Sequence, residues 1–109
     1  MCGIAGFVTR DRDPRASGVL DQMTASLRHR GPDDSGFYAD EIASLGHRRL
    51  SIIDLVTGHQ PMSNEDGSLW VIYNGEIFNH VSVRQGLEKA GHDYRTRSDT
   101  ETILHAYEE

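Results

Sequence analysis

Cys2 is the residue of this sequence best suited to covalent chemistry. It follows Met1 directly and is the only cysteine in the chain. If the initiator methionine is removed, which a small second residue permits, one residue carries both a free α-amine and a thiol. Their ordinary pKa values, about 7.7–8.0 and about 8.5, let the amine accept the thiol proton near neutral pH. Cys2 is therefore a candidate nucleophile; the alternative is a small buried hydrophobic residue.

A second group of polar residues follows the apolar run 69–73. Asn74 offers a side-chain amide and Gly75 a backbone N–H, and two such donors at a strand end can stabilise a developing oxyanion. Asn-Gly is also the commonest signal for a hairpin turn. Both interpretations remain open from these residues alone.

Two charged residues could bind the ends of an amino acid. The guanidinium of Arg49 could hold a carboxylate through two parallel hydrogen bonds, or it could pair with a neighbouring surface acid. Asp99 could hold an ammonium group, or it could favour a helix N-terminus. A thiol, an oxyanion donor, a cation and an anion together suit a free α-amino acid with a reactive side-chain carbonyl, and glutamine fits that description.

The elements that must position these residues alternate between strands and helices. Hydrophobic spacing predicts a helix over 17–28 and a second helix that carries Val83, Leu87 and Ala90 and ends at Gly91. A third helix is expected after Ser98, whose spacing to Glu101 is that of a capping box, with Ile103, Leu104 and Tyr107 as its apolar stripe. Extended segments are expected at 4–8, 35–39, 42–48 and 51–55, with a loop over 58–67 and a strand over 69–73 that is covered on both faces.

Composition excludes several classes of protein. The 109 residues carry 17 acidic and 11 basic side chains, a net charge of −6, which argues against a nucleic-acid partner. The longest apolar run is far shorter than the ~20 residues that span a bilayer. The N-terminus lacks a secretory signal, so a cytoplasmic setting is expected. Zinc-ligand spacing is absent, so we expect no metal. The segment 31–36 has P-loop glycine spacing without its lysine and indicates a structural turn.

Six segments taken together resemble a known family. They are MCGIAGF from Met1, RHRGPDDSG from Arg28, GHRRLSIIDL from Gly46, GHQP from Gly58, YNGEIFNH from Tyr73 and RSDTETILHAY from Arg97. In this order they are similar to the glutaminase domain of asparagine synthetases, the class II, N-terminal-nucleophile glutamine amidotransferases. The resemblance covers essentially all of residues 1–109, which we therefore expect to be the N-terminal part of such a domain.

The resemblance implies an α+β fold of four layers, α/β/β/α, in which Cys2 attacks the side-chain amide of glutamine. It implies that Asn74 and Gly75 form the oxyanion hole, that Arg49 holds the substrate carboxylate and that Asp99 holds its ammonium. The remaining substrate-binding residues it implies, largely through their backbone, are Leu50, Ser51, Ile52, Ile53 and Glu76.

Length is the main departure from the family pattern. The family's glutaminase domain is roughly twice as long and precedes an ATP-using synthetase domain, whose pyrophosphate loop is absent here. No cofactor is therefore expected in this segment; ATP and Mg belong to the synthetase partner. A domain cut within its sheets would expose an edge and favour aggregation or a homodimer. Two alternatives stay open: a non-catalytic fragment or interaction module, and the glutaminase part of an amidotransferase with another acceptor.

Overall fold

The computed structural model describes residues 2–50 and 58–109. The extended segment expected at 51–55 therefore lies outside the described residues. Strands and helices are mixed along the chain, as an α+β fold requires. Their order is β1 (Gly3–Val8), α1 (Ala16–Ala25), β2 (Asp34–Ala39), β3 (Ala43–Arg49), β4 (Met62–Ser63), β5 (Trp70–Val71), α2 (His80–Lys89) and α3 (Asp99–Glu108).

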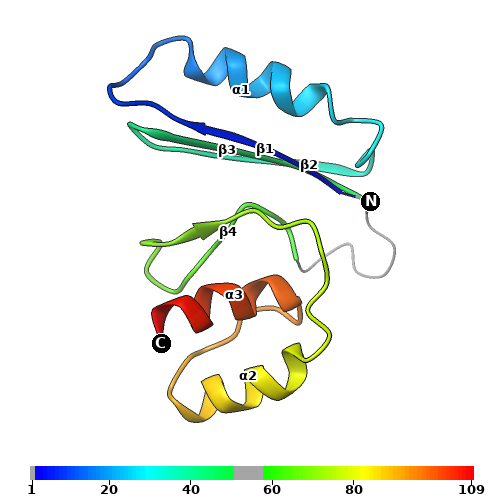
Figure 1. The fold of residues 1–109 in the computed structure, drawn as a ribbon, viewed down its shortest axis with the longest axis vertical. Helices are drawn as coiled ribbons and strands as arrows, with labels where there is room; N and C mark the ends of the chain where they lie inside the picture. The colour runs from blue at the N-terminus through cyan, green and yellow to red at the C-terminus, as the bar shows by residue number, and fades with distance from the viewer. Residues whose placement is uncertain (1, 51–57) are drawn as a thin grey trace.

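The strands β1, β2 and β3 form an antiparallel sheet in the order β1-β3-β2, so β3 is central. Helix α1 lies across one face of this sheet (Figure 1). Leu20 and Thr24 are the buried residues of α1. A Cβ on Gly46 of β3 would run into the Thr24 hydroxyl, so the absence of a side chain there lets helix and strand approach closely.

The opposite face of the sheet meets a small antiparallel ribbon formed by β4 and β5. Tyr38 of β2 stacks on Trp70 of β5 with the ring centroids 4.3 Å apart. A Cβ on Gly36 would collide with the carbonyl of Gln60, which shows how closely the segment before β4 approaches β2. Figure 1 shows the resulting tiers along the long axis: α1, the three-stranded sheet, the ribbon, and then α3 with α2.

The strand expected over 69–73 is shorter and less buried than its sequence indicates. Only Trp70 and Val71 pair with β4, and Trp70 is 37% exposed. Side chains replace ladder bonds on either side: the Leu69 N–H donates to Asn64 Oδ1, and the Tyr73 N–H donates to Gln60 Oε1. The expectation of a strand covered on both faces is therefore wrong, and the loop expected over 58–67 contains β4.

Helix α3 buries an unusually polar face between the ribbon and α2. Leu104 is buried, but Tyr107 of the expected apolar stripe is 78% exposed. The other buried residues of α3 are polar, namely Thr100, Glu101, Thr102 and His105. Apolar spacing alone therefore gave the helix correctly but only part of its buried face.

The N-terminus of α3 is capped by one half of the expected capping box. Ser98 Oγ accepts a hydrogen bond from the Thr100 N–H. Glu101 does not reach back to Ser98; its carboxylate instead accepts from the N–H groups of Arg95 and Thr96 and from the Thr96 hydroxyl, at 2.6–2.7 Å. Glu101 thus fixes the turn that leads into α3. Among the described helices, none is long and apolar enough to cross a membrane.

Candidate active site at the end of the sheet

Cys2 lies at the N-terminal end of β1 and is half-buried. Its carbonyl accepts a hydrogen bond from Arg30 Nε at 3.1 Å. The turn that carries Arg30 is held in the same way, because Arg48 Nε donates to the Gly31 carbonyl at 2.8 Å. Two guanidinium groups therefore fix the backbone around the candidate nucleophile. Of the segment 31–36, in which a structural turn was expected, residues 31–33 form the connection and residues 34–36 already belong to β2.

The strand register places Cys2 and Arg49 at the same end of the sheet. Gly3 pairs with Arg48 across the β1–β3 ladder. The same register, continued by one residue, sets Cys2 opposite Arg49, and opposite residues of antiparallel strands share a face of the sheet. By strand alternation this is also the face of His47, turned toward the ribbon. The sheet therefore positions a thiol and a guanidinium together.

Asp99 approaches the same region from α3. A Cβ on Gly58, where φ is +85°, would lie 3.4 Å from Arg49 Nη2 and 3.6 Å from Ser98 Oγ, so Gly58 separates the guanidinium from the start of α3. Asp99 follows Ser98, and its Oδ2 accepts a hydrogen bond from the Ile77 N–H at 2.9 Å. The Arg49 guanidinium and Ser98, the residue before Asp99, thus flank one glycine.

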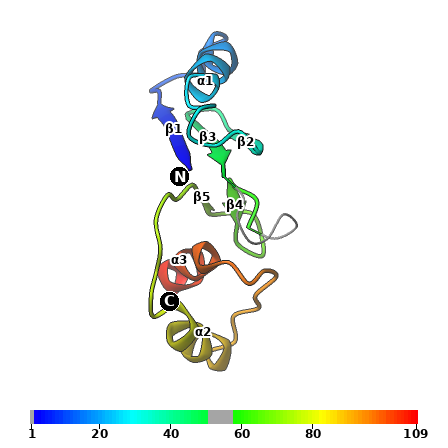
Figure 2. The ribbon, with the colours of Figure 1, turned by 90° about the vertical axis from the view of Figure 1, so that its right-hand side faces the viewer.

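The segment that carries Asn74, Gly75 and Glu76 connects β5 to α2, and all three residues are exposed. It begins against the sheet, because buried His47 makes a hydrogen bond with the Tyr73 backbone. His47 is paired with Ile4 in the ladder. Figures 1 and 2 accordingly place the start of this connection beside the N-terminal end of β1. The predicted oxyanion donors therefore lie near the candidate nucleophile but on an exposed connection.

Of the predicted substrate-binding residues 50–53, the structure describes only Leu50. Leu50 is half-buried directly after β3. Ser51, Ile52 and Ile53 lie outside the described residues. An open pocket of about 360 Å³ occurs next to Gly58, and Arg95, Glu101 and Trp70 contribute to its lining. Gly58 and His59 line its side toward the sheet end, but neither Cys2 nor Arg49 is among its lining residues.

Ionisable side chains at the sheet end interact with one another. His59 lies 2.7 Å from Asp34, and this hydrogen bond, supported by the Ser35 N–H and by Arg49, holds the pKa of Asp34 below its ordinary value. Burial lowers the pKa of His47, so its imidazole stays neutral near pH 7. The positive charge on this face therefore comes chiefly from Arg49.

Two residues with a structural part in this region were not singled out from the sequence. Arg30 holds the Cys2 carbonyl, and the only sequence signal for it is its place in the RHRGPDDSG segment. Buried Gln60 accepts from the Tyr73 N–H through Oε1 and donates to Thr100 Oγ1 through Nε2. Gln60 thereby joins the connection after β5 to α3, a role that local spacing does not reveal.

The structure thus combines a mixed α+β fold with a thiol directly before the first strand and with Arg49 close to the start of α3. A model of the family described as "Glutamine amidotransferase domain" matches residues 1–109, so the chain belongs to the glutamine amidotransferase domain family.

Similar curated proteins are named glutamine-hydrolysing asparagine synthetases. The chain is 42% identical over 110 residues to asparagine synthetase [glutamine-hydrolyzing] 1 of Bacillus subtilis (strain 168), with 98% of the chain and 17% of that relative covered. It is 46% identical over 110 residues to asparagine synthetase [glutamine-hydrolyzing] of Brassica oleracea, with 100% of the chain and 18% of the relative covered. The chain thus spans less than a fifth of the length of these relatives.

Proposed function

We propose that the chain hydrolyses the side-chain amide of glutamine to glutamate and ammonia through Cys2. The observation that carries the proposal is that Cys2 and Arg49 adjoin the paired residues Gly3 and Arg48 at one end of the sheet, and that Gly58 lies between Arg49 and Ser98, the residue before Asp99. A guanidinium and a carboxylate on opposite sides of a small gap suit the α-carboxylate and α-ammonium of a free amino acid. Family membership supports glutamine as that amino acid.

The chemistry begins once Met1 has been removed. The α-amine of Cys2 accepts the thiol proton, and the thiolate sulfur attacks the carbonyl carbon of the amide. Asn74 and the Gly75 N–H stabilise the oxyanion of the tetrahedral intermediate. The C–N bond then breaks, and the leaving nitrogen takes the proton from the α-ammonium and departs as ammonia. Water attacks the resulting glutamyl thioester, which releases glutamate and restores the thiol.

Residues around the sheet end position the substrate. In the proposal Arg49 holds the carboxylate and Asp99 the ammonium, while residues 50–53 and Glu76 complete the wall. The Arg30 hydrogen bond to the Cys2 carbonyl fixes the main chain at the nucleophile. Preorganisation of this kind keeps the sulfur within reach of the amide and saves the reorganisation that a mobile N-terminus would require.

The tiers seen in Figure 1 support assignment to the four-layer N-terminal-nucleophile fold. We infer further that ammonia passes to a synthetase domain, which would supply the ATP and Mg chemistry and determine the acceptor. The small share of its relatives' length that the chain covers supports such a partner. A cytoplasmic setting, with Cys2 kept reduced, suits this function.

Release of glutamate and ammonia from glutamine tests the proposed function. Intact mass first establishes that Met1 is absent. We expect turnover by the chain and none by Cys2→Ala, with Cys2→Ser as a near-isosteric control for folding. Glutamate release that survives Cys2→Ala would remove Cys2 from the mechanism. Glutamine binding without any turnover would favour a non-catalytic module instead.

A further inference from the structure

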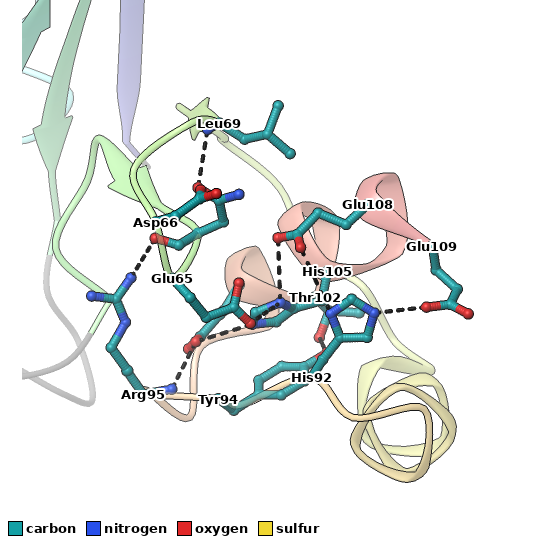
Figure 3. A network of polar contacts seen from close by, with 12 residues as sticks. Glu65, Asp66, Leu69, His92, Tyr94, Arg95, Thr102, His105, Glu108 and Glu109 are labelled. Carbon is teal, nitrogen blue, oxygen red and sulfur yellow. Dashed lines mark hydrogen bonds and ion pairs between the residues drawn. The ribbon is translucent and has the colours of Figure 1, made fainter.

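A cluster of two histidines and two glutamates lies apart from the sheet end. Glu65 comes from the turn between β4 and β5, His92 from the α2–α3 connection, and His105 and Glu108 from α3. One potential ligand atom from each lies within 4.8 Å of all the others. Figure 3 shows His92 and His105 between the carboxylates. We call these four residues the histidine cluster.

The outer nitrogen of each imidazole contacts a carboxylate. His105 Nε2 lies 3.3 Å from Glu101 Oε1, and His92 Nε2 lies 2.7 Å from Glu109 Oε2 (Figure 3). Histidines that ligate metals almost always donate their other ring N–H to such a group, which fixes the tautomer and the ring orientation. Both rings here are held so that Nδ1 faces the cluster.

The Nδ1 atom of His105 is buried and has no hydrogen-bond partner among the described residues. The side chain is 1% exposed, and the nearest carboxylate atoms are Glu65 Oε1 at 3.2 Å and Glu108 Oε1 at 3.8 Å. With the proton on Nε2, a lone pair on Nδ1 faces two anionic oxygens, and that arrangement is favourable only when Nδ1 is protonated as well or when a metal cation lies between them. An unsatisfied buried nitrogen of this kind calls for a specific occupant.

We propose that Glu65, His92, His105 and Glu108 bind one divalent transition-metal ion, with zinc the best match. Neighbouring ligand atoms of a tetrahedral zinc site lie roughly 3.3 Å apart, given Zn–N distances of about 2.0–2.1 Å. The cluster approaches this spacing at 3.2, 3.8 and 3.9 Å. The 3.8 and 3.9 Å distances end on different oxygens of Glu108, so metal binding would require this carboxylate to turn. Two imidazoles select zinc and its neighbours over calcium and magnesium, which prefer all-oxygen sites.

The ion would have a structural role, because it would cross-link separate segments of the fold. It would join the ribbon turn to the α2–α3 connection and α3, which lie more distantly along the chain. All four positions would be filled by protein ligands, which is typical of structural rather than catalytic zinc. Access is provided on the side of Glu65 and Glu108, whose side chains are 39% and 27% exposed, whereas His105 is enclosed. The proposal is independent of glutamine hydrolysis.

Zinc titration monitored by a competing chromogenic chelator tests the proposal. The experiment uses the chain in a Cys2→Ala background, because a thiolate is itself a strong zinc ligand. We expect one ion per chain and an increase in Tm on zinc addition. His92→Gln and Glu108→Gln should each weaken binding by at least about tenfold, as the loss of a ligand does. Both side chains are partly exposed, so circular dichroism should show an unchanged fold.

His29→Gln is the matched control, because His29 is exposed and outside the histidine cluster. It should leave the affinity and the stoichiometry unchanged. X-ray absorption at the zinc edge should show imidazole scattering and only nitrogen or oxygen ligands at about 2.0–2.1 Å. The proposal is overturned if zinc does not bind, or if it binds the His92→Gln, Glu108→Gln and His29→Gln chains equally well.

Discussion

The sheet end and the histidine cluster are built in opposite ways. At the sheet end, backbone segments approach one another where side chains are missing, as Gly31 and Gly36 show. In the histidine cluster the contacts are made by charged side chains, supported by buried Glu101. Adding side-chain volume should therefore destabilise the sheet end, whereas removing a charge at constant volume should destabilise the region around the histidine cluster. The following substitutions test that contrast, in order of expected effect.

Gly36→Ala should have the largest effect on stability. The new methyl group would meet the backbone carbonyl of Gln60, which cannot move away as a flexible side chain would. We expect the free energy of unfolding to fall by about 3 kcal/mol or more, at the upper end of the cost of overpacking. Urea denaturation measures the change.

Gly86→Ala in α2 is the control for that prediction, because nothing lies within 4 Å of its Cβ position. Alanine is favoured over glycine inside a helix by about 1 kcal/mol, so this variant should be as stable as the parent chain or more so. Equal midpoints for the two glycine variants would contradict the close approach at the sheet end.

Glu101→Gln should have the next largest effect. The carboxylate accepts hydrogen bonds from the N–H groups of Arg95 and Thr96 and from the Thr96 hydroxyl. An amide of almost the same volume loses the charge and turns an NH₂ group toward donors, so we expect a loss of about 2 kcal/mol. Glu88→Gln, in an exposed pair with Arg84, should change stability by less than about 0.5 kcal/mol. A similar loss in both variants would show that burial of Glu101 is unimportant.

Arg49→Ala should act on binding more than on stability. If Arg49 holds the substrate carboxylate through a charge-assisted bond worth about 1.5–3 kcal/mol, glutamine binding should weaken by roughly one to two decades. Isothermal titration calorimetry measures the affinity, and Arg12→Ala, at an exposed position, is the control. An unchanged affinity would assign Arg49 to ion pairing at the sheet end.

His47 should give the smallest effect, visible as a dependence of stability on pH. Burial lowers its pKa below 6.5, helped by nearby His59 and Arg49 and opposed by the Tyr73 backbone bond and by Asp34. The unfolded chain then binds a proton before the folded chain does. The contribution of His47 is therefore complete above about pH 6.5 and is lost progressively below it.

Thermal unfolding between pH 5 and 8 measures that contribution. The fall in Tm on the acidic side should be shallower in His47→Gln than in the parent chain. The exposed His29→Gln variant should retain the parent slope. Identical slopes in all three chains would show that the environment of His47 does not favour its neutral form.

Local patterns predicted most of the elements, for definite reasons. The apolar spacing predicted a helix over 17–28, and α1 is found there but ends at Ala25, before Leu27. Gly91, with φ at +101°, follows the end of α2 as a glycine stop should. The strand over 69–73 was wrong in extent because Asn64 and Gln60 take over its backbone bonds from outside the segment. Side-chain capture of this kind depends on tertiary contacts, which periodicity does not contain.

The candidate active site and the histidine cluster also differ in how far local sequence patterns predict them. Cys2 and Asn74 drew attention through their immediate neighbours in the sequence, and Arg49 through its strand end. The histidine cluster was missed because Glu65 and His92 are separated by α2 and the connections around it, so no local ligand spacing exists. Its local signals are confined to α3, where His105 follows Glu101 by four residues and Glu108 follows His105 by three.

Covalent labelling of Cys2 tests the central claim most directly. A diazoketone analogue of glutamine alkylates a thiolate with loss of N₂, and it requires both the nucleophile and a pocket shaped for glutamine. Intact and tandem mass spectrometry should show one adduct per chain, located on Cys2 and suppressed by added glutamine, with none on chains that retain Met1. An adduct elsewhere, or labelling that glutamine does not suppress, would contradict Cys2 as the nucleophile of a glutamine site.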